Sequence, residues 1–323
     1  MPLTNIHHAL SQQTPAYIIK PLLGLVSQDQ MVDFLTSENS FLLKTLPRKY
    51  LASILKLFTR GLDEINDDLA DIYAEALVPD FSAPPEGEEE NTVSYKIDGQ
   101  VIEIQEQRNV LSGQGGTGRR TWEAALALCE WLSHELRAER GFESVSSVLG
   151  NFDFLGEKNG TSHVVELGAG TGLSGLFLAK NGIKTTLTDG DDFVVQQLHH
   201  TIEANKLEEV CFDRRLFWGK DEPDTSEKVT HVIAADVTYD PSIAPELTDC
   251  LSQFAQLDPP PRMIGSATIR DEATYQTFLA ECEKKGLEVR PLKELVPPYE
   301  SEFVFLDPIM APKVIIAEIK KKQ

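Results

Sequence analysis

The stretch VVELGAGTGLSG, residues 164–175, places Gly168, Gly170 and Gly172 between an apolar run and a helical pattern. Glycine lets the backbone turn tightly and lets a ligand approach without meeting a β-carbon. A helix that starts directly after such a turn presents unpaired N–H groups to the same place. The stretch therefore predicts a strand, a ligand-binding turn and a helix.

The details of this turn differ from a dinucleotide-binding turn. Dinucleotide enzymes favour G-x-G-x-x-G, whereas the third glycine here comes one residue early and Glu166 precedes the first. A carboxylate is unfavourable beside a pyrophosphate but suits a cationic ligand. Asp189 in TLTD follows Gly168 by about 20 residues, where a carboxylate accepts hydrogen bonds from ribose hydroxyls. Glu166 thus favours a cationic ligand, and Asp189 stands where a ribose would be bound.

Strand and helix patterns alternate around the turn. Strands are expected at residues 163–167, 184–189, 211–217, 231–236, 262–268, 287–290 and 313–319. Helices are expected at residues 122–139, 172–182, 192–205, 244–255 and 272–286. Alternation of this kind predicts an α/β fold, with a parallel sheet covered by helices on both faces.

The first part of the chain has a different pattern. Residues 28–77 have apolar positions at helical spacing, including the stripe Leu62, Ile65, Leu69, Ile72 and Ala76. Pro47 stands where a second helix, over residues 47–58, would begin. We predict a small helical domain over residues 1–78.

An acidic, proline-rich stretch follows the helical part. Residues 79–91 hold three prolines and four glutamates and are typical of an exposed linker. The second domain, residues 92–323, is expected to open with a β-hairpin, because strand-like alternation flanks Asp98-Gly99, a pair that favours a two-residue turn.

Composition limits the partners. The 323 residues have 41% hydrophobic side chains and a net charge of −21. This charge disfavours nucleic acid and anionic membrane and suits a basic partner, although an acidic surface also simply keeps a protein soluble. The four scattered cysteines predict free thiols and no metal cluster. Without an apolar leader or a run of about 20 apolar residues, we expect a cytosolic or nuclear protein, most simply a cytoplasmic one.

Several motifs together point to a family. ELGAGTG and TLTD resemble the first two binding motifs of class I S-adenosylmethionine-dependent methyltransferases. TGRRTWEAALALCEWL, VVELGAGTGLSG, LTDGD, RLFWG and ADVTYD follow the order and spacing of methyltransferase family 16, the seven-stranded lysine methyltransferases. TGRRTWEAAL and the helical region before it resemble the branch that methylates elongation factor 2, including its fungal form. The resemblance is clear over about residues 95–320.

The resemblance implies a fold, a cofactor, a substrate and site residues. It implies a seven-stranded Rossmann-like sheet, S-adenosyl-L-methionine as cofactor and elongation factor 2 as protein substrate, and we expect a monomer. Trp122 would pack by the cofactor, Asp189 would bind its ribose and Trp218 would border its adenine. The predicted cofactor-binding residues are Trp122, Glu166, Gly168, Ala169, Gly170, Gly172, Asp189, Trp218 and Ala235.

The predicted catalytic residues are Asp236 and Tyr239 of ADVTYD, a D-x-x-Y motif at the carboxyl edge of the sheet. Free lysine has a pKa of about 10.4, so the site must align the amine and receive it unprotonated. Asp236 would accept hydrogen bonds from the amine, and Tyr239 would wall the channel. A carboxylate raises the pKa of a nearby amine, so Asp236 is expected to orient it rather than to act as its base. A purely structural role, with Asp236 capping the turn, stays open.

Three other functions also stay open on sequence grounds. A lysine methyltransferase for a different protein would share every motif. A non-catalytic binding module could have kept the fold, although the intact glycine turn, Asp189 and D-x-x-Y disfavour it. A dinucleotide oxidoreductase is disfavoured by the glycine spacing and by Glu166.

Overall fold

The structure is a computed structural model that describes residues 2–36, 46–60, 62–78, 91–107, 117–141, 153–155, 162–299 and 301–322. The predicted linker, residues 79–91, lies outside these ranges except for Asn91, which begins a strand. Among the helices within the ranges, none is long and apolar enough to cross a membrane.

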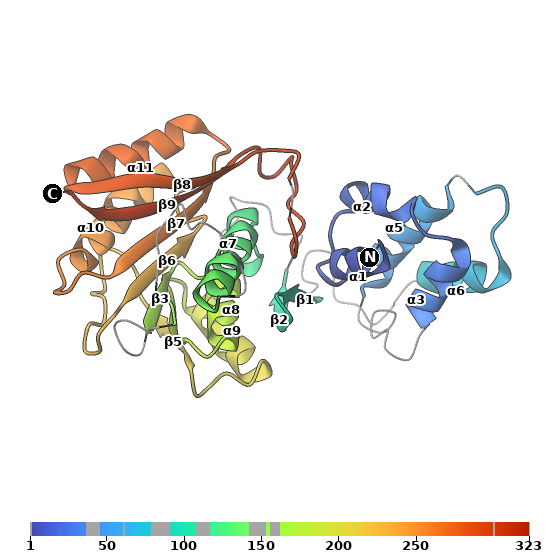
Figure 1. Ribbon diagram of the computed structural model, residues 1–323, viewed down its shortest axis with the longest axis horizontal. Coiled ribbons are helices and arrows are strands. Elements are labelled where there is room, and N and C mark those ends of the chain that lie inside the picture. The colour runs from blue at the N-terminus through green and yellow to red at the C-terminus, as the bar shows by residue number, and fades with distance from the viewer. Residues whose placement is uncertain are drawn as a thin grey trace.

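A seven-stranded sheet with the order β5-β4-β3-β6-β7-β9-β8 forms the centre of the larger part (Figure 1). Its strands are β3 (His163–Leu167), β4 (Lys184–Asp189), β5 (Cys211–Arg215), β6 (His231–Ala235), β7 (Arg262–Thr268), β8 (Leu287–Leu295) and β9 (Val314–Lys321). β3 pairs in parallel with both β4 and β6, so the strand order switches direction there. The carboxyl ends of these strands therefore meet around one crevice.

One strand departs from the predicted parallel sheet. β9 is antiparallel to both neighbours, β7 and β8. The described residues between β8 and β9 contain no helix. Strands joined without a crossover pair antiparallel, whereas a parallel neighbour needs a crossover connection. The seven-stranded sheet is confirmed, but it is mixed.

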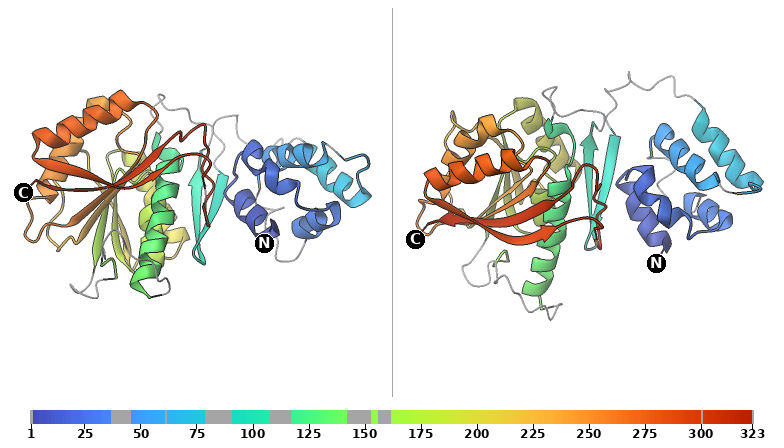
Figure 2. Two further views of the ribbon diagram at one scale, coloured as in Figure 1. Left: turned by 45° about the horizontal axis from the view of Figure 1, so that its top comes forward. Right: turned by 90° about the horizontal axis from the view of Figure 1, so that it is seen from above.

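Helices cover both faces of the sheet, as predicted (Figures 1 and 2). One face is covered by α7 (Glu123–Glu139), α8 (Leu173–Lys180) and α9 (Asp192–Ala204), and the other by α10 (Ala244–Phe254) and α11 (Glu272–Lys284). Buried apolar side chains form a separate core on each face. The structure thus has the three-layer arrangement of α/β proteins.

The predicted hairpin is present as β1 (Asn91–Ile97) and β2 (Gln100–Glu106). Asp98 and Gly99 form its turn, with φ angles of +47° and +79°. The hairpin packs on the outer side of the first helix layer, against α8 and α9. Because α8 lies between sheet and hairpin, Leu173 to Ala179 are all buried, which explains why this helix is apolar on every side.

A third core holds the N-terminal helices together. These helices are α1 (Pro2–Ser11), α2 (Ala16–Leu23), α3 (Gln28–Thr36), α5 (Arg48–Thr59) and α6 (Asp67–Leu77). In Figures 1 and 2 they lie beyond the hairpin. α1 and α2 lie within the predicted helical domain but before residues 28–77, where the apolar spacing indicated helices.

The predicted stripe of Leu62, Ile65 and Leu69 is also partly wrong. α6 begins only at Asp67, because the side chain of Asn66 accepts the N–H of Leu69 and caps the helix. Leu62 and Ile65 lie before this cap and are 37% and 40% exposed. A local capping residue has overridden the helical spacing of the apolar positions.

Helix α8 approaches the sheet most closely at Gly175. A β-carbon there would lie 2.2 Å from Leu187 Cδ2 and 2.7 Å from Glu166 Oε2. The Gly175 N–H donates a 2.9 Å hydrogen bond to the Glu166 carboxyl group. Glu166 is 2% exposed, and burial raises its pKa to about 8. The side chain of Glu166 thus lies beneath α8, in the protein interior.

Replacing Gly175 with alanine should destabilise the protein by overpacking, by roughly 2 kcal/mol. The new methyl group would overlap side chains of β3 and β4 that cannot all move. Gly265→Ala in β7 is the matched control, because its β-carbon would meet only Ile319 Cδ1 at an ordinary 3.4 Å. Urea unfolding measures both variants. Equal stability of the two would contradict the close packing.

Replacing Glu166 with glutamine should remove a pH dependence of folding. An acid with a pKa near 8 when folded and about 4.3 when unfolded binds an extra proton in the folded protein. Wild-type stability should therefore fall as the pH rises from about 5 to about 8. Glutamine keeps an oxygen that accepts the Gly175 N–H, but its side chain does not ionise. From the lower to the higher pH, the free energy of unfolding of the variant should therefore rise by on the order of 3 kcal/mol relative to that of wild type. Urea unfolding of both proteins across this pH range measures the difference in stability. A difference that does not change with pH would show that Glu166 is not a buried, protonated acid.

Candidate active site

A pocket of about 690 Å³ opens at the carboxyl ends of β3, β4 and β6. This volume is typical of small-molecule and cofactor sites. Most of the predicted site residues line it, namely Trp122, Gly168, Ala169, Gly170, Asp189, Trp218, Ala235, Asp236 and Tyr239. The structure thus brings together residues from five segments of the chain that the sequence analysis selected separately.

The glycine turn forms the floor of this pocket. Gly168 and Gly170 have φ angles of +58° and +53°, in the left-handed region that favours glycine. A β-carbon at Gly168 would lie 2.8 Å from Val237 Cγ1 and 3.1 Å from the Trp218 ring. A β-carbon at Gly170 would touch the backbone of Gly118 at 3.4 Å. Gly168 is therefore required both by its conformation and by its neighbours, whereas Gly170 is required by its conformation.

Glu166 and Gly172 do not line the pocket with the other predicted residues. Side chains alternate between the two faces of a strand, and Glu166 faces α8. Gly172 precedes the first residue of α8, and a β-carbon there would meet Leu198 and Leu187 within 3 Å. Both residues support the turn from behind rather than from the ligand side.

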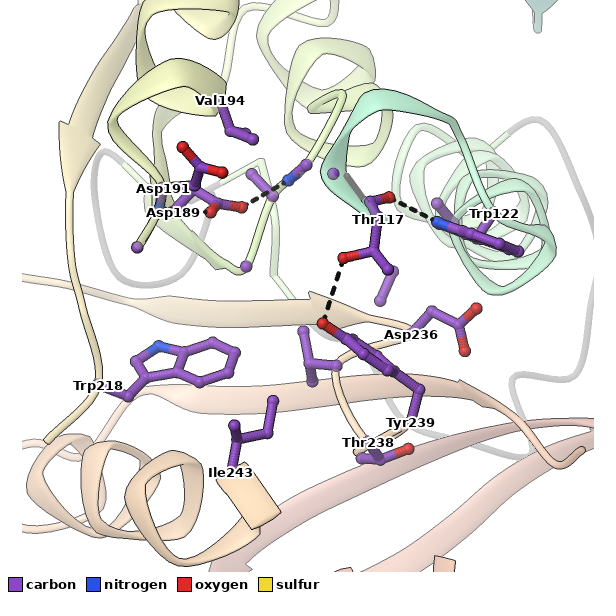
Figure 3. A pocket seen from close by; sticks show the side chains of 18 of the residues that line it. Thr117, Trp122, Asp189, Asp191, Val194, Trp218, Asp236, Thr238, Tyr239 and Ile243 are labelled. Carbon is purple, nitrogen blue, oxygen red and sulfur yellow. Dashed lines mark hydrogen bonds between the residues drawn. The ribbon is translucent and has the colours of Figure 1, made fainter. Parts of the chain in front are cut away.

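An acid held by backbone donors marks one end of the pocket. Asp189 accepts the N–H of Gly170 at 3.1 Å through Oδ2 and the N–H of Asp191 at 3.0 Å through Oδ1. Burial raises the pKa of Asp189. Figure 3 shows Asp191 and Val194 beside it. These residues would present a fixed carboxylate and an aliphatic side chain to a nucleoside.

Trp218 forms another wall, and Figure 3 shows Ile243 below it in the view. Both residues line the pocket, and the Trp218 ring lies over the Gly168 backbone. An indole and an aliphatic side chain suit the flat face of a base.

Asp236 lies at the opposite end, directly after β6. Its φ of +56° is uncommon for a residue other than glycine. The backbone N–H of Asp236 donates to the Ser266 carbonyl at 2.8 Å. Its carboxylate accepts the N–H of Thr268 at 3.2 Å and Arg270 Nη2 at 2.9 Å. The side chain is 8% exposed and is thus held in one orientation at the pocket wall.

Tyr239 lies between the two ends of the pocket. Its hydroxyl group is 3.3 Å from Thr117 Oγ1, and Figure 3 shows this contact crossing the cavity. Thr117 also accepts the Trp122 Nε1–H with its carbonyl oxygen at 2.8 Å. Tyr239 is 49% exposed, as a residue at a channel mouth would be. Thr117 was not among the predicted site residues, although it stands in the recognised TGRRTW motif.

A cluster of charges surrounds Trp122. The guanidinium groups of Arg120 and Arg270 each lie 5.0 Å from its ring centroid. Glu123 pairs with Arg120 at 3.2 Å and contacts Arg270 at 3.5 Å. Burial raises the pKa of Glu123, and the nearby positive charges of Arg120 and Arg270 offset only part of this increase. This cluster fixes Trp122 and Asp236 relative to each other.

The sequence analysis also missed Arg270. It lies 34 residues after its partner Asp236 and belongs to no recognised motif. One signal was available, because Arg270 closely follows β7, the strand next to β6. Residues just after neighbouring parallel strands meet at the same edge of the sheet.

Within the described residues, no group of histidine, cysteine, aspartate or glutamate could hold a metal ion. The four cysteines, Cys129, Cys211, Cys250 and Cys282, are free and buried.

The family described as "Lysine methyltransferase" (Methyltransf_16) matches residues 96–285. Protein-lysine N-methyltransferase EFM3 of Saccharomyces cerevisiae is 34% identical over 305 residues, covering 86% of this chain and 86% of that protein. Protein-lysine N-methyltransferase EEF2KMT of Homo sapiens is 28% identical over 271 residues, covering 76% and 73%. EEF1A lysine methyltransferase 3 of Mus musculus is 32% identical over 127 residues, covering 38% and 45%.

The match to the Saccharomyces cerevisiae protein covers 86% of this chain, which is more than residues 92–323 alone could provide. This match therefore extends into the N-terminal helices. The chain belongs to the lysine methyltransferase family and is a class I, S-adenosylmethionine-dependent protein-lysine N-methyltransferase.

Proposed function

We propose that this enzyme transfers a methyl group from S-adenosylmethionine to a lysine of elongation factor 2. One observation carries the proposal: a single pocket joins the glycine turn and Asp189 at one end to Asp236 and Tyr239 at the other. A methyltransferase needs these two ends, because the cofactor and the amine must meet in line. Figure 3 shows both ends on either side of Tyr239.

The cofactor would occupy the end formed by Asp189 and Trp218. Asp189 would accept hydrogen bonds from the ribose hydroxyls, and Trp218 would border the adenine. Gly168 and Gly170 carry no β-carbon, so the ligand can approach their backbone. The pocket volume and these side chains fit a nucleoside that carries an amino acid.

The remaining predicted contacts belong to the middle of the pocket. Ala235 ends β6 between the cofactor end and Asp236, and its small side chain would leave room for the methyl group. Ala169 and Trp122 would border the cofactor from the turn and from the start of α7.

The lysine would enter past Tyr239 and meet Asp236. When bound, S-adenosylmethionine supplies a methyl group on a sulfonium, so the amine nitrogen forms a bond to carbon while the carbon–sulfur electron pair stays on sulfur. A carboxylate has about four acceptor positions, and the Thr268 and Arg270 bonds use two of them. The others would accept N–H groups of the amine and aim its lone pair at the methyl carbon. Tyr239 would close the side of the channel.

Three arguments support elongation factor 2 as the substrate. TGRRTWEAAL and the N-terminal region resemble the branch that methylates this factor. The human relative bears the name EEF2KMT and matches most of this chain, whereas the mouse EEF1A lysine methyltransferase 3 matches a minor part. A net charge of −21 also suits a basic partner surface. Elongation factor 1A is the second candidate, favoured by the name of that mouse relative.

The same proposal covers the parts around the catalytic domain. The N-terminal domain, residues 1–78, would help to recognise the elongation factor, joined by the linker at residues 79–91 to residues 92–323. We propose that the enzyme acts as a monomer in the cytoplasm, where translation occurs.

Purified elongation factor 2 should accept labelled methyl groups from S-adenosylmethionine in the presence of this enzyme. Asp236→Asn should slow the transfer about 100-fold, because the amine loses its charged acceptor and its alignment. Asp240→Asn, a carboxylate change in the same loop at a side chain that bonds Ser242, is the matched control and should act within about twofold of wild type. Label on elongation factor 1A, on nucleic acid or on a small molecule instead would refute the substrate.

Asp189→Asn should weaken binding of S-adenosylhomocysteine at least about tenfold, because a hydrogen bond to a charged group contributes about 1.5–3 kcal/mol. Asp213→Asn serves as a control, since Asp213 pairs with His199 outside the pocket. Isothermal titration calorimetry with S-adenosylhomocysteine and with NAD compares the ligands. Tighter binding of NAD, or unchanged affinity in Asp189→Asn, would contradict the assigned cofactor end.

A further inference from the structure

Arg270 contacts four residues at the Asp236 end of the pocket. Its Nη2 donates to Asp236 at 2.9 Å and lies 3.5 Å from Glu123 Oε2. Its Nε donates to the Met310 carbonyl oxygen at 3.0 Å, and its guanidinium group lies over the Trp122 ring. About a third of the side chain stays exposed, and the residue lines the pocket. Arg270 is thus a fixed positive charge at the wall of the pocket.

The reaction poses an electrostatic problem at this place. Lysine must arrive as a neutral amine, yet its ordinary pKa of about 10.4 leaves only about one molecule in a thousand neutral near pH 7.4. A lone carboxylate such as Asp236 would worsen this, because an opposite charge within about 4–6 Å favours the ammonium form. Orientation by Asp236 and supply of neutral amine therefore oppose each other.

We propose that Arg270 is a positioning residue that resolves this conflict. By pairing with Asp236 it offsets the negative charge, so that the carboxylate still accepts hydrogen bonds from the amine but no longer holds the amine protonated. The ammonium proton passes to water before transfer, and the nitrogen lone pair is then free to form the new bond to carbon. The inference rests on the proposed function, and it adds a residue that no sequence motif contains.

The surrounding structure keeps Arg270 in place. Met310, which accepts its Nε–H, belongs to the segment 301–313 that leads into β9. Asp307 in that segment accepts the N–H of Ile309 at 2.8 Å and bonds Tyr17 of α2. The guanidinium group is therefore held by the catalytic sheet on one side and, through this segment, by the N-terminal helices on the other. Turning away from Asp236 would break the hydrogen bonds of the guanidinium group to Asp236 and to the Met310 carbonyl oxygen.

Other charges share this end of the pocket. The titratable and charged groups that face Arg270 or line the pocket near it are Arg120, Glu123, Asp236, Tyr239 and Asp271. Glu123 is shared by Arg120 and Arg270, so the two arginines face the two acids Glu123 and Asp236. Asp189 and Asp191 lie at the opposite end (Figure 3). Arg270 is the cation bonded directly to Asp236, so its removal would leave that carboxylate without its paired positive charge.

The test is the pH dependence of single-turnover methyl transfer to elongation factor 2, with saturating enzyme. This rate reports ionisations in the bound complex. Arg270→Gln should move the apparent pKa of the rise in rate upward by about one unit, because the amine is then held protonated by uncompensated Asp236. Arg270→Lys keeps a positive charge and should bring the apparent pKa most of the way back to the wild-type value. Arg290→Gln, which breaks a pair with Glu318 far from the pocket, should leave the profile unchanged.

Several outcomes would overturn the proposal. One is a uniform loss of rate at every pH in Arg270→Gln, which would mean a structural role. Another is a profile that shifts in Glu123→Gln but not in Arg270→Gln, which would assign the ionisation to Glu123. If Arg270→Gln fails to fold, the wild-type profile still decides, because a rate that keeps rising to about pH 10 contradicts a lowered amine pKa. No methylation of elongation factor 2 by wild-type enzyme refutes the proposed function instead.

Discussion

A side chain has no room at Gly168, in the turn between β3 and α8, or at Gly175 within α8, and both fold and site depend on this. Because Gly175 has no side chain, α8 packs closely on β3 and β4, whose ends lie side by side in the sheet. The Gly170 N–H can then reach the Asp189 carboxylate, and the Trp218 ring can lie on Gly168. Glu166, buried beneath α8, fastens the turn from below. The tight packing of one helix thus shapes the ligand side of the pocket.

The other end of the pocket depends on charge rather than on close packing. Asp236 adopts a left-handed backbone conformation after β6, and bonds to Ser266, Thr268 and Arg270 hold it there. Strained backbone of this kind is common at functional sites. The two ends come from different halves of the sheet, which meet where β3 lies beside β6. The methyl donor and the methyl acceptor can therefore be positioned independently, each by its own end of the pocket, and still face each other.

Sequence reasoning predicted the parts that depend on local pattern. The sheet strands, the Asp98-Gly99 hairpin turn and most pocket residues follow from alternation, turn chemistry and the recognised motifs. The reversed strand β9 did not, because strand direction depends on how the chain crosses the sheet. The inward side chain of Glu166 and the Asp236–Arg270 pair were missed because both are tertiary contacts, the latter between residues 34 apart in sequence. The late start of α6 was missed because the Asn66 cap overrode the apolar spacing.

Residues 96–285 carry the family match, while the N-terminal helices and the segment 301–313 connect to the site through Asp307 and Met310. We propose that this pocket methylates a lysine of elongation factor 2. The intact and peptide mass spectrum of elongation factor 2, from cells with and without this enzyme, tests this proposal. We expect one lysine to lose its methyl mass when the enzyme is absent, and a wild-type copy to restore this mass while an Asp236→Asn copy does not. An unchanged spectrum would contradict it.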